Sequence, residues 1–468
     1  MTNIDYLKQY QVNNAVITQE GLVYSYKNLI DISDTIYNNI KHRSLVFCLC
    51  KNQIGALSGY ISFITNRVVP LMLDASLDKR LLDELIIAYK PEFLWLPNDR
   101  MNEFPNGYEI FSILGYSLLK IESDSYFYLH DNLALLLTTS GSTGSPKLVR
   151  ISYENLEVNA LSIAEYLSID ENERPITTLP MNYSFGLSII NSHLIKGATI
   201  LLTSNSMIEN EFWTFLKENK GTSLSGVPFT FELLNKLGFF RMDLPSLKTL
   251  TQAGGNLNKD LNKVFVEFCK QSDRHFVIMY GQTEATARMS YLPSQYSLSK
   301  SGSIGVPIPG GAFSLIDESG ELIEESDFTG ELVYKGKNVS MGYAECGLDL
   351  KKEDENHGIL FTGDLAKRDN ENFYYIVGRK NRFIKLFGNS VNLDDTERLL
   401  KNILPECACI GEDDNMLIYI TDRTKLKEVR KYISSITGIN HASFTIKFID
   451  AIPKDPSGKT IYSKLAFS

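Results

Sequence analysis

ALLLTTSGSTGSPK, residues 134–147, decides the fold: an apolar run leads directly into a loop of hydroxyl side chains and glycines that ends on a lysine. The apolar run predicts a buried strand. Glycines let the backbone turn its N–H groups toward an anion, hydroxyls add donors, and Lys147 supplies a cation. The stretch therefore predicts a polyphosphate-binding loop, although a solvated Ser/Gly turn is the alternative and no Walker A spacing occurs. We call it the phosphate loop; its expected ligand contacts are Thr139, Ser140, Gly141, Ser142, Thr143, Gly144 and Lys147.

Short apolar runs alternate with longer amphipathic stretches on both sides of this loop. SLVFCLC (44–50) and HFVIMY (275–280) are typical of buried strands, whereas DKRLLDELIIAY (78–89) and KDLNKVFVEFCKQ (259–271) have helical spacing. Such alternation favours an α/β fold whose sheets are mixed but largely parallel.

The pattern changes after about residue 300, where short strands are separated by Gly and Asp turns, and again near 380, where β-like and helical pieces mix. We expect a large N-terminal domain over 1–378, with subdomains of about 1–300 and 301–378. The second subdomain is expected to be β-rich. A small, mobile α+β domain is expected over 379–468, with the boundary in the polar stretch Gly378–Asn381.

Composition excludes several classes of function. The 468 residues are 43% hydrophobic and 22% charged, which is ordinary for a soluble globular protein. The net charge of -9 and the lack of a basic run make nucleic acid and anionic membranes poor partners. The N-terminus lacks signal-peptide features and no apolar run is long enough to insert in a membrane. Cys48 and Cys50 lie in an apolar run and are interpreted as buried thiols, so a cytoplasmic location is expected.

Several further motifs follow one another in a fixed order. Together with the phosphate loop they resemble the ANL superfamily, which contains acyl-CoA synthetases, adenylation domains of nonribosomal peptide synthesis and luciferases. The matching stretches are RVVPLMLDASLDKRLLDELI (67–86), TQAGG (251–255), YGQTE (280–284), TGD (362–364), GRKNRFIKLFG (378–388) and PKDPSGK (453–459).

The resemblance implies that ATP and Mg²⁺ are used to form an acyl-adenylate, which is then passed to the thiol of CoA or of phosphopantetheine. Glu284 would hold Mg²⁺ through hard carboxylate oxygens, and Thr283 would donate to a phosphate oxygen. Asp364 would accept the ribose hydroxyls, and Arg379 would reach the ribose or a phosphate. Taken singly, these residues would be interpreted as turn and surface residues. The other implied nucleotide contacts are Ala253, Gly254, Gly255, Tyr280, Gly281 and Gln282.

The resemblance also implies a catalytic role for Lys459, which lies in a Pro/Ser/Gly loop near the end of the sequence. In the family such a lysine neutralises the α-phosphate in the transition state, which is electrostatic stabilisation. A lysine on a mobile domain suits a two-step reaction with a hinge. Asn381 stands at the hinge position, where relatives often have Asp or Lys, and Arg382 replaces a common acid.

The acid pocket is expected around 179–190, 226–230, 251–253 and the stretch after Glu284. Gly186 stands where amino-acid-activating relatives carry an ammonium-binding Asp, so an α-amino acid is not favoured. No His follows Leu179-Pro180, unlike in many acyl-CoA synthetases. The residues expected to line the pocket are Tyr183, Phe185, Gly186, Val227, Thr251, Met279, Ala287 and Arg288.

Two of these residues bear on the choice of acid. Met279 would fill the depth of the pocket, and a buried Arg288 would need a hydroxyl, a carbonyl or a second carboxylate. A short or polar acid is therefore expected rather than a long fatty chain. The alternative is that Arg288 points to solvent or pairs with a nearby acid of the protein.

Four functional hypotheses remain open at this point. The first is an AMP-forming ligase that joins a small carboxylic acid to CoA, or to an acyl carrier protein acting in trans, since no attachment segment follows Lys459. The second is an amino-acid-activating ligase similar to the D-alanine enzymes, and a luciferase-like oxygenase is a remote third. A nucleotide-binding regulator without turnover is the hypothesis from a different class.

Overall fold

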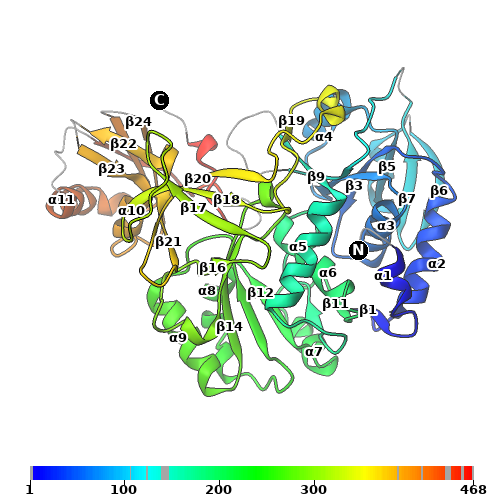
Figure 1. Cartoon of the computed structure of the whole chain (residues 1–468), viewed down its shortest axis with the longest axis horizontal. Coiled ribbons are helices and arrows are strands. Elements are labelled where there is room, and N and C mark those ends of the chain that lie inside the picture. Colours follow the sequence, from blue (N-terminus) through cyan, green and yellow to red (C-terminus); the bar gives the residue numbers. More distant parts are fainter. Residues whose placement is uncertain are drawn as a thin grey trace. The chain divides into compact units, whose positions relative to one another are not determined.

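The computed structural model describes residues 4–105, 107–122, 125–138, 147–386, 389–412, 415–437, 444–454 and 458–465. The described residues form two compact units, which we treat separately (Figure 1). The larger unit comes from within 1–139, 145–312 and 335–360, and the smaller unit includes 313–334 and the described part of 361–468. The domain boundary expected at 378/379 stays a prediction.

The first sheet of the larger unit has nine strands in the order β16-β15-β14-β13-β12-β10-β11-β1-β2. The run from β14 to β1 is parallel, and antiparallel strands β15, β16 and β2 lie at its ends. The strands are β1 Asn14–Thr18, β2 Val23–Ser25, β10 Pro175–Ile176, β11 Ile200–Leu202, β12 Ser223–Gly226, β13 Thr249–Gln252, β14 His275–Tyr280, β15 Ser290–Leu292 and β16 Val306–Pro307.

The second sheet of the larger unit has eight strands in the order β19-β9-β8-β4-β3-β5-β7-β6, with β8, β4, β3 and β5 parallel. The strands are β3 Leu45–Cys50, β4 Val69–Asp74, β5 Phe93–Pro97, β6 Tyr108–Ile113, β7 Tyr116–Lys120, β8 Leu133–Thr138, β9 Leu148–Ser152 and β19 Tyr343–Ala344. The apolar run before the phosphate loop is thus the buried strand β8, as predicted.

Helices cover and separate these sheets. The predicted amphipathic stretches form α4 Lys79–Tyr89 and α9 Lys259–Gln271. The others are α1 Ile4–Lys8, α2 Tyr26–Tyr37, α3 Ile54–Thr65, α5 Tyr153–Tyr166, α6 Ser184–Leu194, α7 Asn210–Glu218 and α8 Pro228–Lys236. Capping boxes start α2 at Ser25 and α5 at Ser152. One apolar core joins Val16 of the first sheet, Val46 of the second and Leu57 of α3, so α3 is buried almost all round.

The smaller unit contains a four-stranded antiparallel sheet and an α+β part. The sheet has the order β17-β18-β20-β21, with β17 Ala312–Ile316, β18 Thr329–Lys335, β20 Ile359–Arg368 and β21 Tyr374–Arg379. Next come the hairpin β22 Phe383–Leu386 and β23 Asn389–Asn392, the helices α10 Leu393–Leu400 and α11 Leu426–Thr437, and the sheet β24 Cys407–Glu412, β25 Asn415–Ile420 and β26 Phe444–Phe448. Ile384, Leu400, Ile418 and Ile433 share one core there. The expected α/β class, with β-rich and α+β parts after residue 300, is confirmed.

Two observations complete the fold. Within the described ranges, none of the helices combines the length and the apolar surface that a bilayer crossing requires. All six cysteines are free thiols, and Cys48 and Cys50 are buried in β3 as expected. Burial raises the pKa of the Cys50 thiol well above its usual range.

Candidate active site

The candidate site begins at the carboxyl edge of the nine-stranded sheet. Parallel strands β12, β13 and β14 end there at Gly226, Gln252 and Tyr280, and ligands of open α/β sheets bind at such an edge. Gly254 has a φ of +83°, and a Cβ on it would lie 2.9 Å from the Tyr183 hydroxyl oxygen. A Cβ on Gly281 would lie 1.9 Å from the Ala287 carbonyl oxygen. The left-handed backbone therefore favours glycine at 254, and close backbone packing requires it at 281.

Thr283 and Glu284 lie in the short turn η3 Thr283–Ala285 that follows β14. Asn338 holds this turn from both sides: its side chain donates to the Ala285 carbonyl at 2.9 Å, and its carbonyl accepts from Thr286 Oγ1 at 2.7 Å. Thr286 has a φ of +66°, so these contacts stabilise a strained backbone. The Thr283 hydroxyl lies 3.1 Å from the hydroxyl of Ser184 on α6.

The carboxylate of Glu284 is held by a tyrosine. Tyr343 of β19 donates its hydroxyl to Glu284 Oε1 at 2.8 Å. Burial and the adjacent Glu284 carboxylate raise the pKa of Tyr343, so the phenol stays protonated and remains a donor. Lys147 Nζ lies 5.6 Å from the Tyr343 ring centre and 2.9 Å from Glu345 Oε1. The Glu284 carboxylate fits Mg²⁺, which proteins usually hold through one or two carboxylates together with substrate phosphates.

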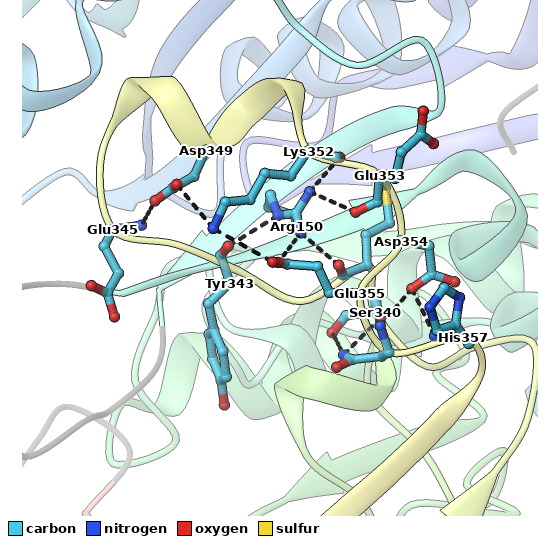
Figure 2. A network of polar contacts seen from close by, with 12 residues as sticks. Arg150, Ser340, Tyr343, Glu345, Asp349, Lys352, Glu353, Asp354, Glu355 and His357 are labelled. Atoms are coloured by element: carbon cyan, nitrogen blue, oxygen red, sulfur yellow. Dashed lines mark hydrogen bonds and ion pairs between the residues drawn. The ribbon is translucent and has the colours of Figure 1, made fainter.

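Figure 2 shows what positions Tyr343: the fully buried side chain of Arg150 on β9. Its guanidinium donates to the carbonyls of Met341 at 2.7 Å, Tyr343 at 3.0 Å and Lys352 at 2.6 Å. It also pairs with the Glu355 carboxylate at 2.5 Å. Burial lowers the pKa of Arg150, and the Glu355 carboxylate opposes this shift. One buried cation thus fastens the segment that brings Tyr343 to Glu284.

Neither Tyr343 nor Arg150 stands out in the sequence as a functional residue. The one available signal is the charge within the apolar strand LVRIS, 148–152, because a buried arginine requires partners. Those partners lie 191 to 205 positions further along the chain and could not be inferred from spacing.

The residues expected to line the acid pocket come together beside this turn. Phe185, Val227, Ala253 and Met279 share one apolar cluster, and Tyr183 packs against it. Leu179 and Ile189 of the predicted stretch 179–190 belong to the same cluster, and the members that were not predicted are Val277, Tyr166, Leu167 and Tyr291.

The remaining predicted pocket residues are also buried. Thr251 donates to Ser225 Oγ at 2.7 Å within the sheet, and Ala287 is buried after the η3 turn. A Cβ on Gly186 would lie 2.3 Å from the Pro180 carbonyl oxygen, so a side chain does not fit there. Arg288 is only 3% exposed, with its guanidinium carbon 3.8 Å from the Phe185 ring centre. The alternative that Arg288 points to solvent is therefore wrong.

The smaller unit brings together the predicted ribose contacts. Asp364 of β20 and Arg379 of β21 are cross-strand neighbours, with Asp364 Oδ1 3.3 Å from Arg379 Nε. Asp364 is buried, and its backbone N–H donates to Thr362 Oγ1 at 3.1 Å. Gly363, between Thr362 and Asp364, has a φ of +69°, a left-handed backbone conformation that favours glycine.

The contacts of Arg382 in the same unit explain why an arginine can stand at this position, where relatives commonly have an acid. Arg382 is buried and donates to Glu397 Oε1 at 2.7 Å and Asp394 Oδ1 at 2.8 Å. Tyr462 donates its hydroxyl to the second oxygen of Glu397 at 2.9 Å and lies under the Arg382 guanidinium. Arg382 therefore has its own buried carboxylate.

The structure gives less information on three further predictions, which concern Asn381, Lys459 and the phosphate loop. Asn381 lies in the 3-10 turn η6 Lys380–Arg382, which follows β21. Lys459 precedes the turn η9 Tyr462–Lys464 and lies in the described segment 458–465. The phosphate-loop residues Thr139 to Gly144 lie outside the described residues, between β8 and β9 in sequence. The catalytic and binding roles of all these residues stay predictions.

Comparison with known proteins agrees with this geometry. The family described as AMP-binding enzyme matches residues 122–344. The chain is 28% identical to a 2-succinylbenzoate–CoA ligase of Bacillus licheniformis over 72% of this chain and 70% of that protein. It is 26% identical to a feruloyl-CoA synthase of an Amycolatopsis species over 71% of this chain and 69% of that one.

The fold is also shared with a solved enzyme. The o-succinylbenzoate CoA synthetase of Bacillus subtilis, solved with its acyl-adenylate intermediate, superposes with a TM-score of 0.80 at 21% identity, covering 99% of this chain and 98% of that one. The solved structure shares the fold, and the domain match and the named relatives lead to one conclusion: the chain belongs to the ANL superfamily of adenylate-forming enzymes.

Proposed function

We propose that this chain is an AMP-forming acid–CoA ligase. In the first step an oxygen of the acid's carboxylate attacks the α-phosphorus of ATP, and the bond to the β-phosphate breaks, releasing pyrophosphate. In the second step the thiolate of CoA attacks the acyl carbon, and AMP leaves with the bonding electron pair. Both steps need charge stabilisation and alignment, because phosphoryl and acyl transfer depend chiefly on positioning.

The observation that carries this proposal is the arrangement around Glu284. Its carboxylate accepts the hydroxyl of Tyr343, whose ring centre lies 5.6 Å from Lys147 Nζ. Glu284 lies on the turn that follows β14, beside the apolar cluster expected to receive the acid. Mg²⁺ bound there would neutralise phosphate charge. Thr283 would donate to a phosphate oxygen, and the Asp364–Arg379 pair would bind the ribose.

The packing of Gly186 weighs against the amino-acid-activating alternative. An ammonium-binding Asp at this position would place its Cβ 2.3 Å from the Pro180 carbonyl oxygen, so the backbone would have to move. The relatives named above act as CoA ligases, which favours CoA over a carrier protein as the acceptor. We propose a cytoplasmic enzyme, with an acyl carrier protein in trans as the alternative acceptor.

Pyrophosphate exchange tests the first step. The purified chain is incubated with ATP, Mg²⁺, labelled pyrophosphate and a panel of aliphatic, aromatic, dicarboxylic and amino acids. Acid-dependent exchange is expected, with CoA then yielding the thioester detected by mass spectrometry. ATP binding without exchange for any acid would support the non-catalytic regulator instead. Exchange with amino acids alone, or thioester formed only on a carrier protein, would overturn the assignment to CoA ligation.

A further inference from the structure

Three arginines are buried in the part of the chain that the structure describes: Arg150, Arg288 and Arg382. Two of them have a carboxylate partner, since Arg150 pairs with Glu355 and Arg382 with Glu397. A buried charge requires such partners, because removing an ion from water costs several kcal/mol. Arg288 departs from this rule.

The contacts of Arg288 are aromatic rings and neutral oxygens. Its guanidinium carbon lies 3.8 Å from the centre of the Phe185 ring, and its Nη1 is 3.4 Å from the Ala287 carbonyl. Its buried Nε has no hydrogen-bond partner among the described residues. Burial lowers the pKa of Arg288, and the groups that oppose this shift are the phenols of Tyr166 and Tyr183, with no carboxylate among them.

The surroundings of this cation form one aromatic cluster, which we define as Tyr166, Tyr183, Phe185 and Tyr291. Tyr166 stacks on Tyr291 with ring centres 4.2 Å apart, and Tyr183 meets Phe185 edge to face at 6.3 Å. The same residues pack with Met279 in the apolar cluster at the end of β14. An apolar, ring-lined surround strengthens the attraction of the guanidinium for an anion, because little water screens the charge.

The short separation of Glu284 and Arg288 along the chain determines which end of a substrate Arg288 can bind. Glu284 and Arg288 lie on one short segment, and the Asn338 side chain donates both to the Ala285 carbonyl at 2.9 Å and to the Arg288 carbonyl at 2.8 Å. The reacting carboxylate must meet ATP near Thr283 and Glu284. A guanidinium four residues further on, inside the aromatic cluster, is placed for the other end of the same small molecule.

We propose that the acid activated by this enzyme carries a second carboxylate, and that the buried Arg288 guanidinium binds it within the aromatic cluster. This inference rests on the proposed ligase function and names its substrate class. The second carboxylate supplies the counter-charge that Arg150 and Arg382 receive from the protein itself. Arg288 thereby selects dicarboxylic acids over monocarboxylic acids of the same length.

The experiment compares acids in matched pairs by pyrophosphate exchange: glutarate with its monomethyl ester, and homophthalate with phenylacetate. In the wild type, kcat/KM for at least one diacid is expected to exceed that for its partner by tenfold or more. In Arg288→Met the diacid-to-monoacid ratio is expected to fall by about 10- to 100-fold, as loss of a charged hydrogen bond would produce. Arg288→Lys should retain part of the preference, because the charge remains without the fork geometry.

A stability measurement separates substrate binding from a structural role. Arg288→Met removes an uncompensated buried charge, so its melting temperature should equal or exceed that of the wild type. The matched control Arg150→Met leaves Glu355 and four carbonyls without their donor and should melt at lower temperature.

These experiments distinguish a failure of the dicarboxylate inference from a failure of the proposed ligase function. Exchange with monoacids at the same efficiency as with diacids in the wild type would refute the inference and leave the ligase function intact. Equal loss for both members of a pair in Arg288→Met, together with a lowered melting temperature, would identify a structural cation and also refute it. No exchange with any acid would remove the function on which the inference rests.

Discussion

Glu284 illustrates how a residue acquires its role from a neighbour remote in sequence. Its position in the Tyr-Gly-x-Thr-Glu motif predicts a metal ligand, and its geometry depends on the hydroxyl of Tyr343 at 2.8 Å. Because outer partners orient metal ligands, both residues should affect the use of Mg²⁺.

Substitution of these two residues should change the Mg²⁺ requirement to different degrees. Glu284→Gln removes a ligand charge, so the Mg²⁺ concentration for half-maximal adenylation should rise strongly. Tyr343→Phe keeps the ring and loses the donor, so a smaller rise of about tenfold is expected. Pyrophosphate exchange over a Mg²⁺ titration measures both effects. A midpoint for Glu284→Gln equal to that of the wild type would exclude a ligand role.

Asp364 is expected to bind the ribose from a buried position beside Arg379. Asp364→Ala removes the acceptor for the ribose hydroxyls and should weaken ATP binding by about 10- to 100-fold, the usual range for a charged hydrogen bond. Calorimetric titration with ATP checks this. The matched control is Lys380→Ala, which breaks the exposed pair with Glu331 on the same sheet and should leave ATP affinity unchanged. Equal affinity in both variants would count against the ribose assignment.

At the scale of single elements, α6 shows what a sequence can and cannot predict. Its residues Ser184 to Leu194 are all buried, because the helix packs beside α5 inside the larger unit (Figure 1). The family resemblance implied that Phe185 and Gly186 line the acid pocket; the structure places Phe185 in the apolar cluster and packs Gly186 against the Pro180 carbonyl. The burial of His193 at the other end of the helix carries no sequence signal, because a histidine is found equally often in intermediate positions.

Buried His193 should make stability depend on pH. Burial lowers its pKa from 6.5 to about 4, although the Ile189 carbonyl at 2.8 Å opposes this shift. Because the unfolded chain takes up the proton first, the contribution of neutral His193 is present above about pH 6.5 and is lost as pH falls toward 4. The loss amounts to about 3 kcal/mol over that interval.

His193→Gln removes the titrating group, so its melting temperature should fall less steeply than that of the wild type between these pH values. The carboxylates titrate in both proteins and cancel in the comparison. The exposed His275→Gln is the matched control and should follow the wild-type slope. Parallel curves for all three proteins would show that His193 does not contribute.

The strand β9 and its arginine mark the limit of local prediction. The run LVRIS forms the buried strand β9. The partners of Arg150 belong to residues 341–355, which contain only the two-residue strand β19 and the turn η5 Gly347–Lys351. Their path follows from tertiary hydrogen bonds rather than from local propensity, so no periodicity could have predicted it.

At the scale of the whole molecule, the order of motifs was more informative than any single motif. Parallel sheets bring strand ends from distant residues to one edge, and the motifs at 251–255 and 280–284 follow the neighbouring parallel strands β13 and β14. The boundary between domains was harder to place, because no flexible linker marks it in the sequence. In the structure, residues 313–334 belong with the C-terminal part, which sequence order alone does not indicate.

A single substitution should slow adenylate formation without slowing the transfer of the acyl group to CoA. Lys459 is expected to neutralise the α-phosphate only while the acyl-adenylate forms, so Lys459→Ala should slow pyrophosphate exchange by about 10²- to 10³-fold. Transfer from synthetic acyl-adenylate to CoA should stay within a few-fold of the wild type, since that step does not use the lysine. The matched control for both half-reactions is Lys454→Ala. Lys454 lies five residues before Lys459, and its substitution breaks only an exposed ion pair with Glu406. Equal losses in the two half-reactions would contradict the assignment, because a lysine needed only for folding or general binding would affect both. A selective loss would instead support a small domain that acts in the first step and withdraws before the second.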